Sequence, residues 1–127
     1  MRVAIVEEWD ALRQRLAERL DRLPGVRVVG EAVAEAPAIE MLRALRPDLV
    51  LLGGWLADGH GFNVLRTLRD EGMACRVLAL ADGPGGNERR ACRRLGADGP
   101  YDKTDVDALL ARVRAEAAAG LNLPRSH

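Results

Sequence analysis

Three charged side chains at predicted strand ends are the strongest candidates for chemistry in this sequence. Glu7 and Glu8 follow the apolar run Arg2–Val6, and Lys103 follows the run Gly99–Asp102. Carboxylate oxygens are the ligands that Mg²⁺ prefers, and a lysine ammonium beside them can bind an anionic oxygen. Adjacent glutamates are also common on plain surfaces, and Lys103 is equally compatible with a structural or solvated role. Spacing alone therefore leaves both interpretations open.

These charged residues meet at one edge only if their strands are parallel, and the order of elements predicts that they are. Short apolar runs alternate five times with amphipathic stretches of helical length, which is the pattern of βαβ units. The predicted strands are Arg2–Val6, Val26–Gly30, Asp48–Leu52, Arg76–Ala81 and Gly99–Asp102. The predicted helical core faces are Leu12, Leu16, Leu20 and Leu23; Ile39, Leu42 and Leu45; Phe62, Leu65 and Leu68; Ala91 and Leu95; and Val106, Leu109, Leu110 and Val113. Because ligands bind outside the carboxyl ends of parallel strands, the residues at those ends are the ones to read for function.

Length and composition limit the classes of protein that the chain can be. Its 127 residues predict one domain over residues 1–120, with residues 121–127 as a flexible tail. Lys and Arg total 19, as do Asp and Glu, so no net basic charge attracts nucleic acid or an anionic membrane. No apolar run approaches the roughly 18 residues of a membrane helix, and Met1 leads into a strand rather than a signal peptide. A cytoplasmic protein without membrane or nucleic-acid partners is expected.

Cysteine and histidine give little support to a metal or redox site. Cys75 and Cys92 lack CxxC spacing and lie in apolar patterns, which predicts buried thiols outside any disulfide. His60 and His127 have no partner at the spacing of metal ligands. The sequence also contains no GxGxxG, no P-loop and no nucleophile beside a base. Neither an enzyme nor a cofactor is therefore expected.

Five segments of the chain resemble the receiver domain of two-component response regulators, the CheY-like superfamily. They are MRVAIVEE, VRVVGEA, RPDLVLL, GADG and YDK, and the resemblance extends from Arg2 to about Ala117. It implies a flavodoxin-like α/β fold, with a five-stranded parallel sheet of order 2-1-3-4-5 between two layers of helices. The ending YDK followed by Thr is most similar to small stand-alone bacterial receivers.

The resemblance also implies roles for five positions of the chain, and two of these hold unsuitable residues. The acidic pair that binds Mg²⁺ falls on Glu7 and Glu8, and the lysine of the site falls on Lys103. The phospho-accepting aspartate falls on Gly53, and the hydroxyl residue of the switch falls on Ala81. Glycine offers no nucleophile and alanine no hydroxyl. With one acid missing, Mg²⁺ is expected to bind weakly or not at all, and Lys103 to turn to one of the two glutamates.

Aromatic residues near the same edge are candidate partner contacts. Trp9 follows the acidic pair, Trp55 follows Gly53-Gly54, and Tyr101 lies two residues before Lys103. Tyr101 is one residue later than the family's switching aromatic, so it should point the opposite way unless a bulge intervenes. A tryptophan is more often part of a core than of an interface, and both alternatives stay open. The glycine pair is either a turn that needs positive φ, or a clearing that Trp55 can enter or that lets a partner's backbone approach.

These observations predict a pseudo-receiver that signals by protein–protein contact without its own phosphorylation. The expected partner is a histidine kinase or another regulator, with a homodimer through the fourth and fifth helices as a further option. DNA binding is disfavoured because the sequence ends soon after the fifth predicted helix. Two alternatives remain: phosphorylation of Asp58 in the loop beyond Gly53, and a switch gated by a small anion beside Lys103.

Overall fold

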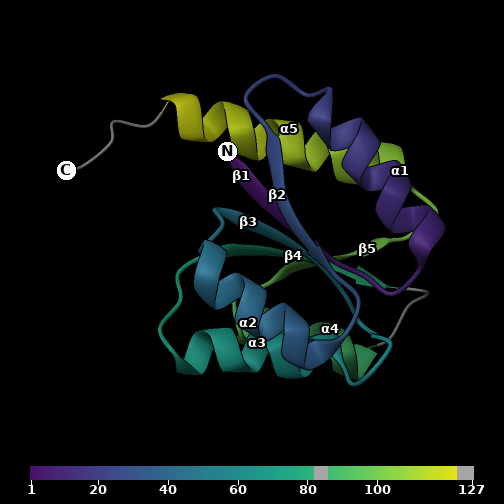
Figure 1. Ribbon diagram of the computed structural model, residues 1–127, viewed down its shortest axis with the longest axis vertical. Helices are drawn as coiled ribbons and strands as arrows, with labels where there is room; N and C mark the ends of the chain where they lie inside the picture. Colours follow the sequence, from purple (N-terminus) through teal and green to yellow (C-terminus); the bar gives the residue numbers. More distant parts are fainter. Residues whose placement is uncertain (82–85, 123–127) are drawn as a thin grey trace.

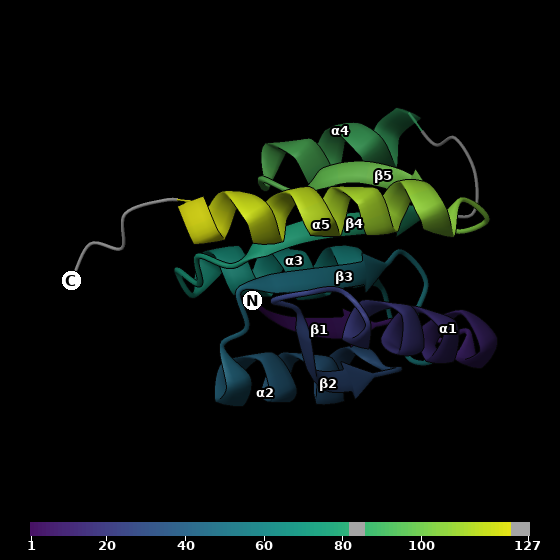
Figure 2. The ribbon, with the colours of Figure 1, turned by 90° about the horizontal axis from the view of Figure 1, so that it is seen from above.

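Five parallel strands form a single central sheet. The computed structural model describes the backbone of residues 1–81 and 86–122 and the side chains of residues 1–81 and 90–120. The strands are β1 (Arg2–Val6), β2 (Arg27–Ala32), β3 (Leu49–Gly53), β4 (Arg76–Ala81) and β5 (Asp98–Asp102). They lie in the order β2-β1-β3-β4-β5, and each neighbouring pair is parallel (Figure 2). The predicted α/β fold and its strand order are confirmed.

Helices cover both faces of this sheet. The helices are α1 (Asp10–Asp21), α2 (Glu35–Leu45), α3 (Gly61–Asp70), α4 (Gly86–Arg94) and α5 (Val106–Asn122). Helices α1 and α5 lie on one face, and α2, α3 and α4 lie on the other (Figure 1). Because side chains alternate along a strand, Val3 and Ile5 join the α1–α5 core while Ala4 and Val6 join the core of the other face. The three inner strands β1, β3 and β4 are covered on both faces, which is why they are nearly continuous apolar runs.

The predicted strand bounds agree with the structure to within two residues. Strands β1 and β4 have the predicted bounds, β3 begins and ends one residue later, and β5 begins one residue earlier. Strand β2 begins at Arg27 and continues to Ala32, beyond the predicted end at Gly30. Its extension follows from pairing with β1, because the backbone N–H of Glu7 donates a hydrogen bond to the Ala32 carbonyl at 3.0 Å.

Helices α1 and α5 bury the residues that periodicity predicts, whereas α2, α3 and α4 depart from the prediction. In α2, Leu42 is buried as predicted, together with Ala38, but Ile39 and Leu45 are only half-buried. Ala91 of α4 and Leu95, directly after that helix, are half-buried, and Cys92 is buried instead.

Helix α1 buries Leu12, Leu16 and Leu20, as predicted. In α3, Leu65 and Leu68 are buried as predicted, together with Val64, whereas Phe62 is only half-buried. The predicted buried face of α3 was counted in steps of three residues and therefore began at Phe62. Because the buried face of a helix also includes steps of one and four residues, Val64 is buried in place of Phe62.

Two helix ends show how local chemistry fixes the bounds. Asp105 caps the N-terminus of α5, where its Oδ1 accepts the N–H of Ala108 at 3.1 Å. The Thr104 hydroxyl donates instead to Asp102. Helix α2 ends at Leu45, and its C-cap residue Arg46 adopts a left-handed conformation with φ of 45° where glycine is more usual.

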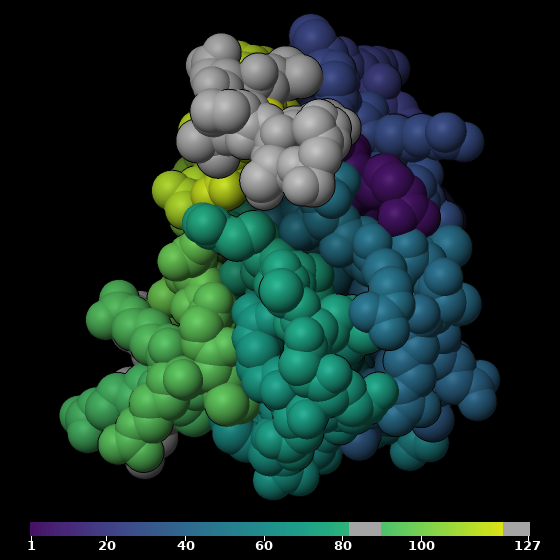
Figure 3. Space-filling model, turned by 90° about the vertical axis from the view of Figure 1, so that its left-hand side faces the viewer, coloured from purple at the N-terminus to yellow at the C-terminus, as the bar shows by residue number. Residues whose placement is uncertain are grey.

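The end of the sheet at which the strands begin is closed by the N-terminal residues. The N–H of Arg27 donates to the Met1 carbonyl, and that of Asp48 donates to the Arg2 carbonyl, both at 2.9 Å. In Figure 3 the purple N-terminus accordingly lies between the dark-blue segment after α1 and the blue-green segment after α2. Of the predicted tail, residues 121–122 end α5, and residues 123–127 lie outside the described part of the chain.

Two further sequence predictions can be compared with the structure. Cys75 and Cys92 are buried and outside any disulfide, as predicted. Burial raises the pKa of the Cys75 thiol, because the apolar surroundings disfavour a thiolate. Over the described residues, none of the helices combines the length and apolar character needed to cross a bilayer.

Candidate functional site

The carboxyl ends of four strands bring the predicted site residues to one edge of the sheet. Glu7 directly follows β1, Gly53 ends β3, Ala81 ends β4, and Lys103 directly follows β5. Parallel strands place all these ends on the same side, where ligands bind in open α/β sheets. Glu8, the second predicted acid, is exposed.

Glu7 and Lys103 form a buried ion pair. The Lys103 Nζ lies 2.8 Å from the Glu7 Oε1, and the two side chains are 5% and 0% exposed. Oε1 receives no hydrogen bond of ordinary geometry from the described residues, so this contact is an ionic one. The other oxygen, Oε2, accepts the backbone N–H of Trp9 at 2.8 Å. A buried charge requires such partners, and the pair confirms that Lys103 turns to a glutamate, namely Glu7.

The Glu7 carboxylate also fills the space beside Gly53. A Cβ placed on Gly53 would lie 2.5 Å from Glu7 Oε1, closer than real Cβ contacts occur. Gly53 belongs to β3 and does not have the positive φ found at other glycines of the chain, so a turn does not explain it. Trp55 does not enter the space either, because it is 59% exposed. A turn with positive φ and the entry of Trp55 are therefore both wrong as explanations of Gly53, and the neighbouring carboxylate is the occupant. The close approach of a partner's backbone stays a prediction.

The described residues at this edge do not fit a Mg²⁺ site. The oxygens of Glu7 already contact Lys103 and the Trp9 N–H, and Glu8 is exposed. Mg²⁺ requires a near-octahedral set of oxygens, to which Gly53 contributes no side chain. Within residues 1–81 and 90–120, no three His, Cys, Asp or Glu side chains are grouped to hold a metal ion. Weak or absent Mg²⁺ binding stays a prediction of this arrangement.

A bulge in β5 determines where its aromatic residue points. Leu80 of β4 pairs with Tyr101, and β5 carries one residue more than β4 across the shifted register. Tyr101 is half-buried and packs against the α1–α5 core, whereas Pro100 lines a hollow on the other face. At the end of β4, the Ala81 carbonyl accepts the Lys103 N–H at 3.2 Å, and the side chain offers no hydroxyl. The bulge that the sequence left open is therefore present.

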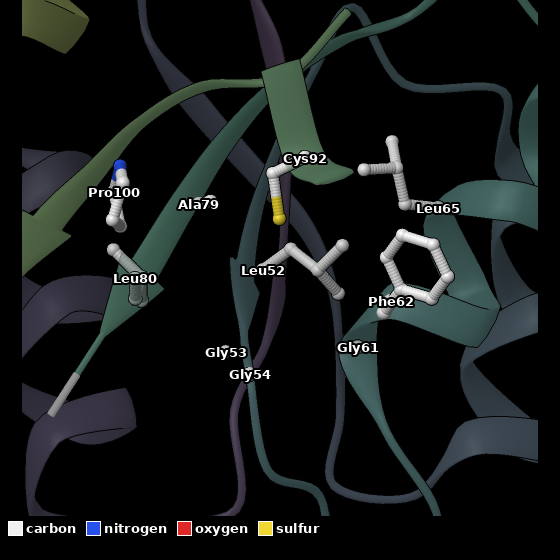
Figure 4. A pocket seen from close by; sticks show the side chains of 10 residues that line it. All are labelled: Leu52, Gly53, Gly54, Gly61, Phe62, Leu65, Ala79, Leu80, Cys92 and Pro100. Carbon is white, nitrogen blue, oxygen red and sulfur yellow. The ribbon is translucent and has the colours of Figure 1, made fainter. Parts of the chain in front are cut away.

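A small apolar hollow lies beside Gly53 on the α3–α4 face. It is lined by Leu52, Gly53, Gly54, Gly61, Phe62, Leu65, Ala79, Leu80, Cys92 and Pro100. Figure 4 shows the Cys92 side chain directed towards Leu52, and the glycines leaving one side without side chains. The space open to the centre of a water molecule is about 20 Å³, which accommodates little more than one water. This hollow is too small and too apolar for a nucleotide or a phosphoryl group.

Three exposed apolar residues follow three neighbouring strands and are called here the rim triad. They are Trp9 after β1, Val33 after β2 and Trp55 after β3, with 53%, 37% and 59% of their surfaces exposed. The Trp55 ring packs edge-on against His60, with ring centroids 4.7 Å apart. Large apolar residues at the surface are typical of contacts with partners. The sequence analysis missed Val33, whose signal was a β-branched residue directly after a strand.

Backbone hydrogen bonds tie the loop after β3 to the loop after β2. The Ala57 N–H donates to the Val33 carbonyl at 2.8 Å, and the Glu35 N–H donates to the Asp58 carbonyl at 3.0 Å. These bonds anchor Asp58 beside the start of α2, on the β2 side of the sheet. Because β2 and β5 are the two outer strands, Asp58 lies away from the β5 end that carries Lys103. This placement argues against Asp58 as an acceptor served by that lysine.

Comparisons with known proteins agree on one family. Residues 3–114 match the family described as response regulator receiver domain. The nitrate/nitrite response regulator protein NarP of Escherichia coli is 31% identical over 116 residues, which cover 91% of this chain and 54% of that protein. The DNA-binding transcriptional activator DevR/DosR of Mycobacterium tuberculosis is 31% identical over 124 residues, covering 97% and 57%. The chain thus spans about half the length of these curated relatives.

A solved structure supports the same assignment. The two-component response regulator of the LuxR family from Aurantimonas sp. SI85-9A1 superimposes with a TM-score of 0.83 at 26% identity. The superposition covers 93% of this chain and 85% of that one. The agreement therefore extends over nearly the whole chain.

Proposed function

This chain belongs to the response regulator receiver domain family, and from that premise we propose that it is a pseudo-receiver. In this proposal it takes part in two-component signalling through protein–protein contact and is not itself phosphorylated. It has no enzymatic role, and the domain extends to about residue 120. The names of the relatives as regulators support the signalling role, while the departures at the site support the absence of phosphorylation.

The observation that carries the proposal is the pairing of Glu7 with Lys103 beside Gly53. Aspartyl phosphorylation requires a carboxylate in line with the donor phosphorus and a metal ion that neutralises the developing charge. If residue 53 is the acceptor position, the chain has no nucleophile there. The lysine that would contact a phosphoryl oxygen is engaged by a buried carboxylate 2.8 Å away. The same contact argues against a switch gated by a small anion, which would have to displace Glu7.

The conformational relay expected of a phosphorylated receiver also lacks its parts. The residue at the end of β4 is Ala81, which cannot bond a phosphoryl oxygen through a hydroxyl. Tyr101 packs against the α1–α5 core, and Pro100 stands one residue before it. We therefore propose that the domain keeps one conformation and that its signal is the presence or absence of a bound partner.

The rim triad is the surface that we propose for this partner. Tryptophan supplies a large contact area at a low cost in conformational entropy and is enriched among residues that dominate binding energy. Trp9, Val33 and Trp55 follow adjacent strands of the sheet. A histidine kinase or another regulator is the proposed partner, in keeping with membership of the response regulator receiver domain family. Tyr101 is half-buried and therefore contributes less to this surface. A homodimer through α4 and α5 is a separate proposal and would use a different surface of the domain.

Incubation with phosphoryl donors tests the proposal directly. The chain is treated with acetyl phosphate, or with beryllofluoride, in the presence of Mg²⁺ and followed by intact mass and by amide NMR spectra. We expect no phosphoryl adduct and no change in the spectra, whereas a receiver domain with an acceptor aspartate, run in parallel, responds. An adduct on the unchanged chain would overturn the proposal. Loss of that adduct in D58N would assign the acceptor to Asp58.

A further inference from the structure

We infer that Glu7 and Gly53 are a coupled pair, in which the Glu7 carboxylate occupies the volume of the side chain that residue 53 lacks. This inference rests on the proposed function, because it takes residue 53 as the acceptor position. It goes further by making Glu7 a positioning residue that holds Lys103 and closes the site without a metal ion. With the Glu7 carboxylate in this position, residue 53 has to be glycine. The missing side chain at residue 53 and the placement of Glu7 are therefore parts of one arrangement.

The strand register places Glu7 beside Gly53. Val6 pairs with Leu52, so the next residues, Glu7 and Gly53, lie opposite one another at the ends of β1 and β3. A Cβ on Gly53 would stand 2.5 Å from Glu7 Oε1 and 3.2 Å from its Cδ. Even an alanine therefore cannot be added unless the carboxylate moves. A glutamate reaches this space because its side chain is one methylene longer than that of aspartate.

The buried charges of Glu7 and Lys103 also disfavour an acidic side chain at residue 53. Among the described residues, the buried ammonium of Lys103 contacts the buried carboxylate of Glu7, whose second oxygen accepts the Trp9 N–H. A carboxylate at residue 53 would add a further negative charge directly beside the Glu7 carboxylate, in a place that solvent does not reach. Volume and charge both make Glu7 and a side chain at residue 53 mutually exclusive.

Stability measurements test the coupling without any ligand. The variants are G53A, E7D and E7D/G53A, with E8D and E8D/G53A as matched controls that shorten the exposed neighbour. We expect G53A to lower Tm by at least about 3 °C in the unchanged chain. The same substitution should cost clearly less in the E7D background, where the carboxylate is withdrawn, and as much as before in the E8D background. An equal loss of Tm in all three backgrounds would overturn the inference.

Metal titration provides a second, independent readout. Mg²⁺ alone is titrated into G53D, E7D/G53D and E8D/G53D, with binding followed by calorimetry. Withdrawing the Glu7 carboxylate should leave room for the new aspartate, so E7D/G53D is expected to bind Mg²⁺ about tenfold or more tightly than G53D. E8D/G53D should resemble G53D. Mg²⁺ binding to G53D as tight as to E7D/G53D would show that Glu7 does not occupy the space, and would overturn the inference.

The two failures are distinguishable. A phosphoryl adduct on the unchanged chain refutes the proposed function, whatever the variants do. Uncoupled behaviour of the Glu7 and Gly53 variants refutes the inference, even when the unchanged chain stays free of phosphate. Coupling together with an unphosphorylated parent chain is the result that supports both.

Discussion

The side chain of Lys103 reaches across the carboxyl ends of β4 and β3 to contact Glu7, which follows β1. Its Nζ lies 2.8 Å from the Glu7 Oε1, and both side chains are nearly inaccessible to solvent. The contact therefore joins an outer strand of the sheet to an inner one, above the position of Gly53. Several measurable properties depend on this single ion pair.

Removal of the lysine should strongly destabilise the domain. In K103M the Glu7 carboxylate stays buried without its counter-charge, which typically costs about 3–5 kcal/mol. Urea denaturation gives the free energy of unfolding. R15M, which removes an exposed charge from α1, should change it by less than about 0.5 kcal/mol. The double variant E7M/K103M should recover much of the loss, and a failure to recover would mean that the ion pair is not the cause.

Lys103 should also resist chemical modification. It is the only lysine in the sequence, so an amine-acetylating reagent has two targets, the α-amino group and Lys103. Because the side chain is 5% exposed, the native protein should be acetylated at the N-terminus alone. In urea both amines should react, and peptide mass spectra distinguish the sites. Acetylation of Lys103 as rapid in the native protein as in urea would contradict the burial.

Gly61 should be the least replaceable glycine near the site. A Cβ at Gly61 would lie 1.9 Å from the Gly53 carbonyl oxygen, and backbone atoms cannot move aside as a side chain can. We expect G61A to lower the free energy of unfolding by more than about 2 kcal/mol. Gly120, in α5, is the matched control, because a Cβ there meets nothing within 4 Å. G120A should stabilise the domain by about 0.5–1 kcal/mol, since alanine favours helix.

The acid side of the stability profile should respond to Thr104. Its hydroxyl donates to Asp102 Oδ1 at 2.7 Å and, with the Thr104 N–H, holds the pKa of that carboxyl below its ordinary value. A lowered pKa means that ionised Asp102 favours the folded state above the ordinary pKa, and that this contribution disappears as pH falls through the folded pKa. T104V should therefore raise the Asp102 midpoint in a carboxyl NMR titration. D102N confirms the assignment, and an unchanged midpoint in T104V would refute the role of the hydroxyl.

The exposed tryptophans should be dispensable for folding. Trp9 and Trp55 are the only tryptophans of the chain, and more than half of each is exposed. Acrylamide should quench both, and W9A and W55A should each change the free energy of unfolding by less than about 0.5 kcal/mol. If the rim triad binds the partner, the same variants should weaken that binding by at least about tenfold. Large destabilisation with blue-shifted, unquenched emission would place these residues in the core instead.

Much of the fold could be predicted because its signals are local. The apolar runs of β1 and β4 and the four-residue steps of Leu12, Leu16 and Leu20 record burial directly in the sequence. The bounds of β2 depend instead on pairing with β1, and the bulge in β5 depends on its register with β4. Such features are set by a neighbouring strand, which periodicity within one segment does not reveal.

The site was predictable in its members but not in its packing. The order of the strands was sufficient to bring Glu7, Gly53 and Lys103 to one edge, and the sequence also indicated a contact between the lysine and a glutamate. The reason for the glycine was not predictable, because it lies in the path of a side chain from a strand 46 residues earlier in the chain. Only the three-dimensional register of β1 and β3 shows that Glu7 rather than Glu8 points there.

The hydrogen bonds between the loops after β2 and β3 have a mechanical consequence. Two backbone hydrogen bonds, one between Ala57 and Val33 and one between Glu35 and Asp58, hold these loops together as a single stiff unit. A force applied to the Trp55 indole is therefore transmitted through these hydrogen bonds to the first turn of α2. A partner bound to this corner would therefore exert a force on α2 without contacting that helix. It would do so without any rearrangement of the Glu7–Lys103 ion pair.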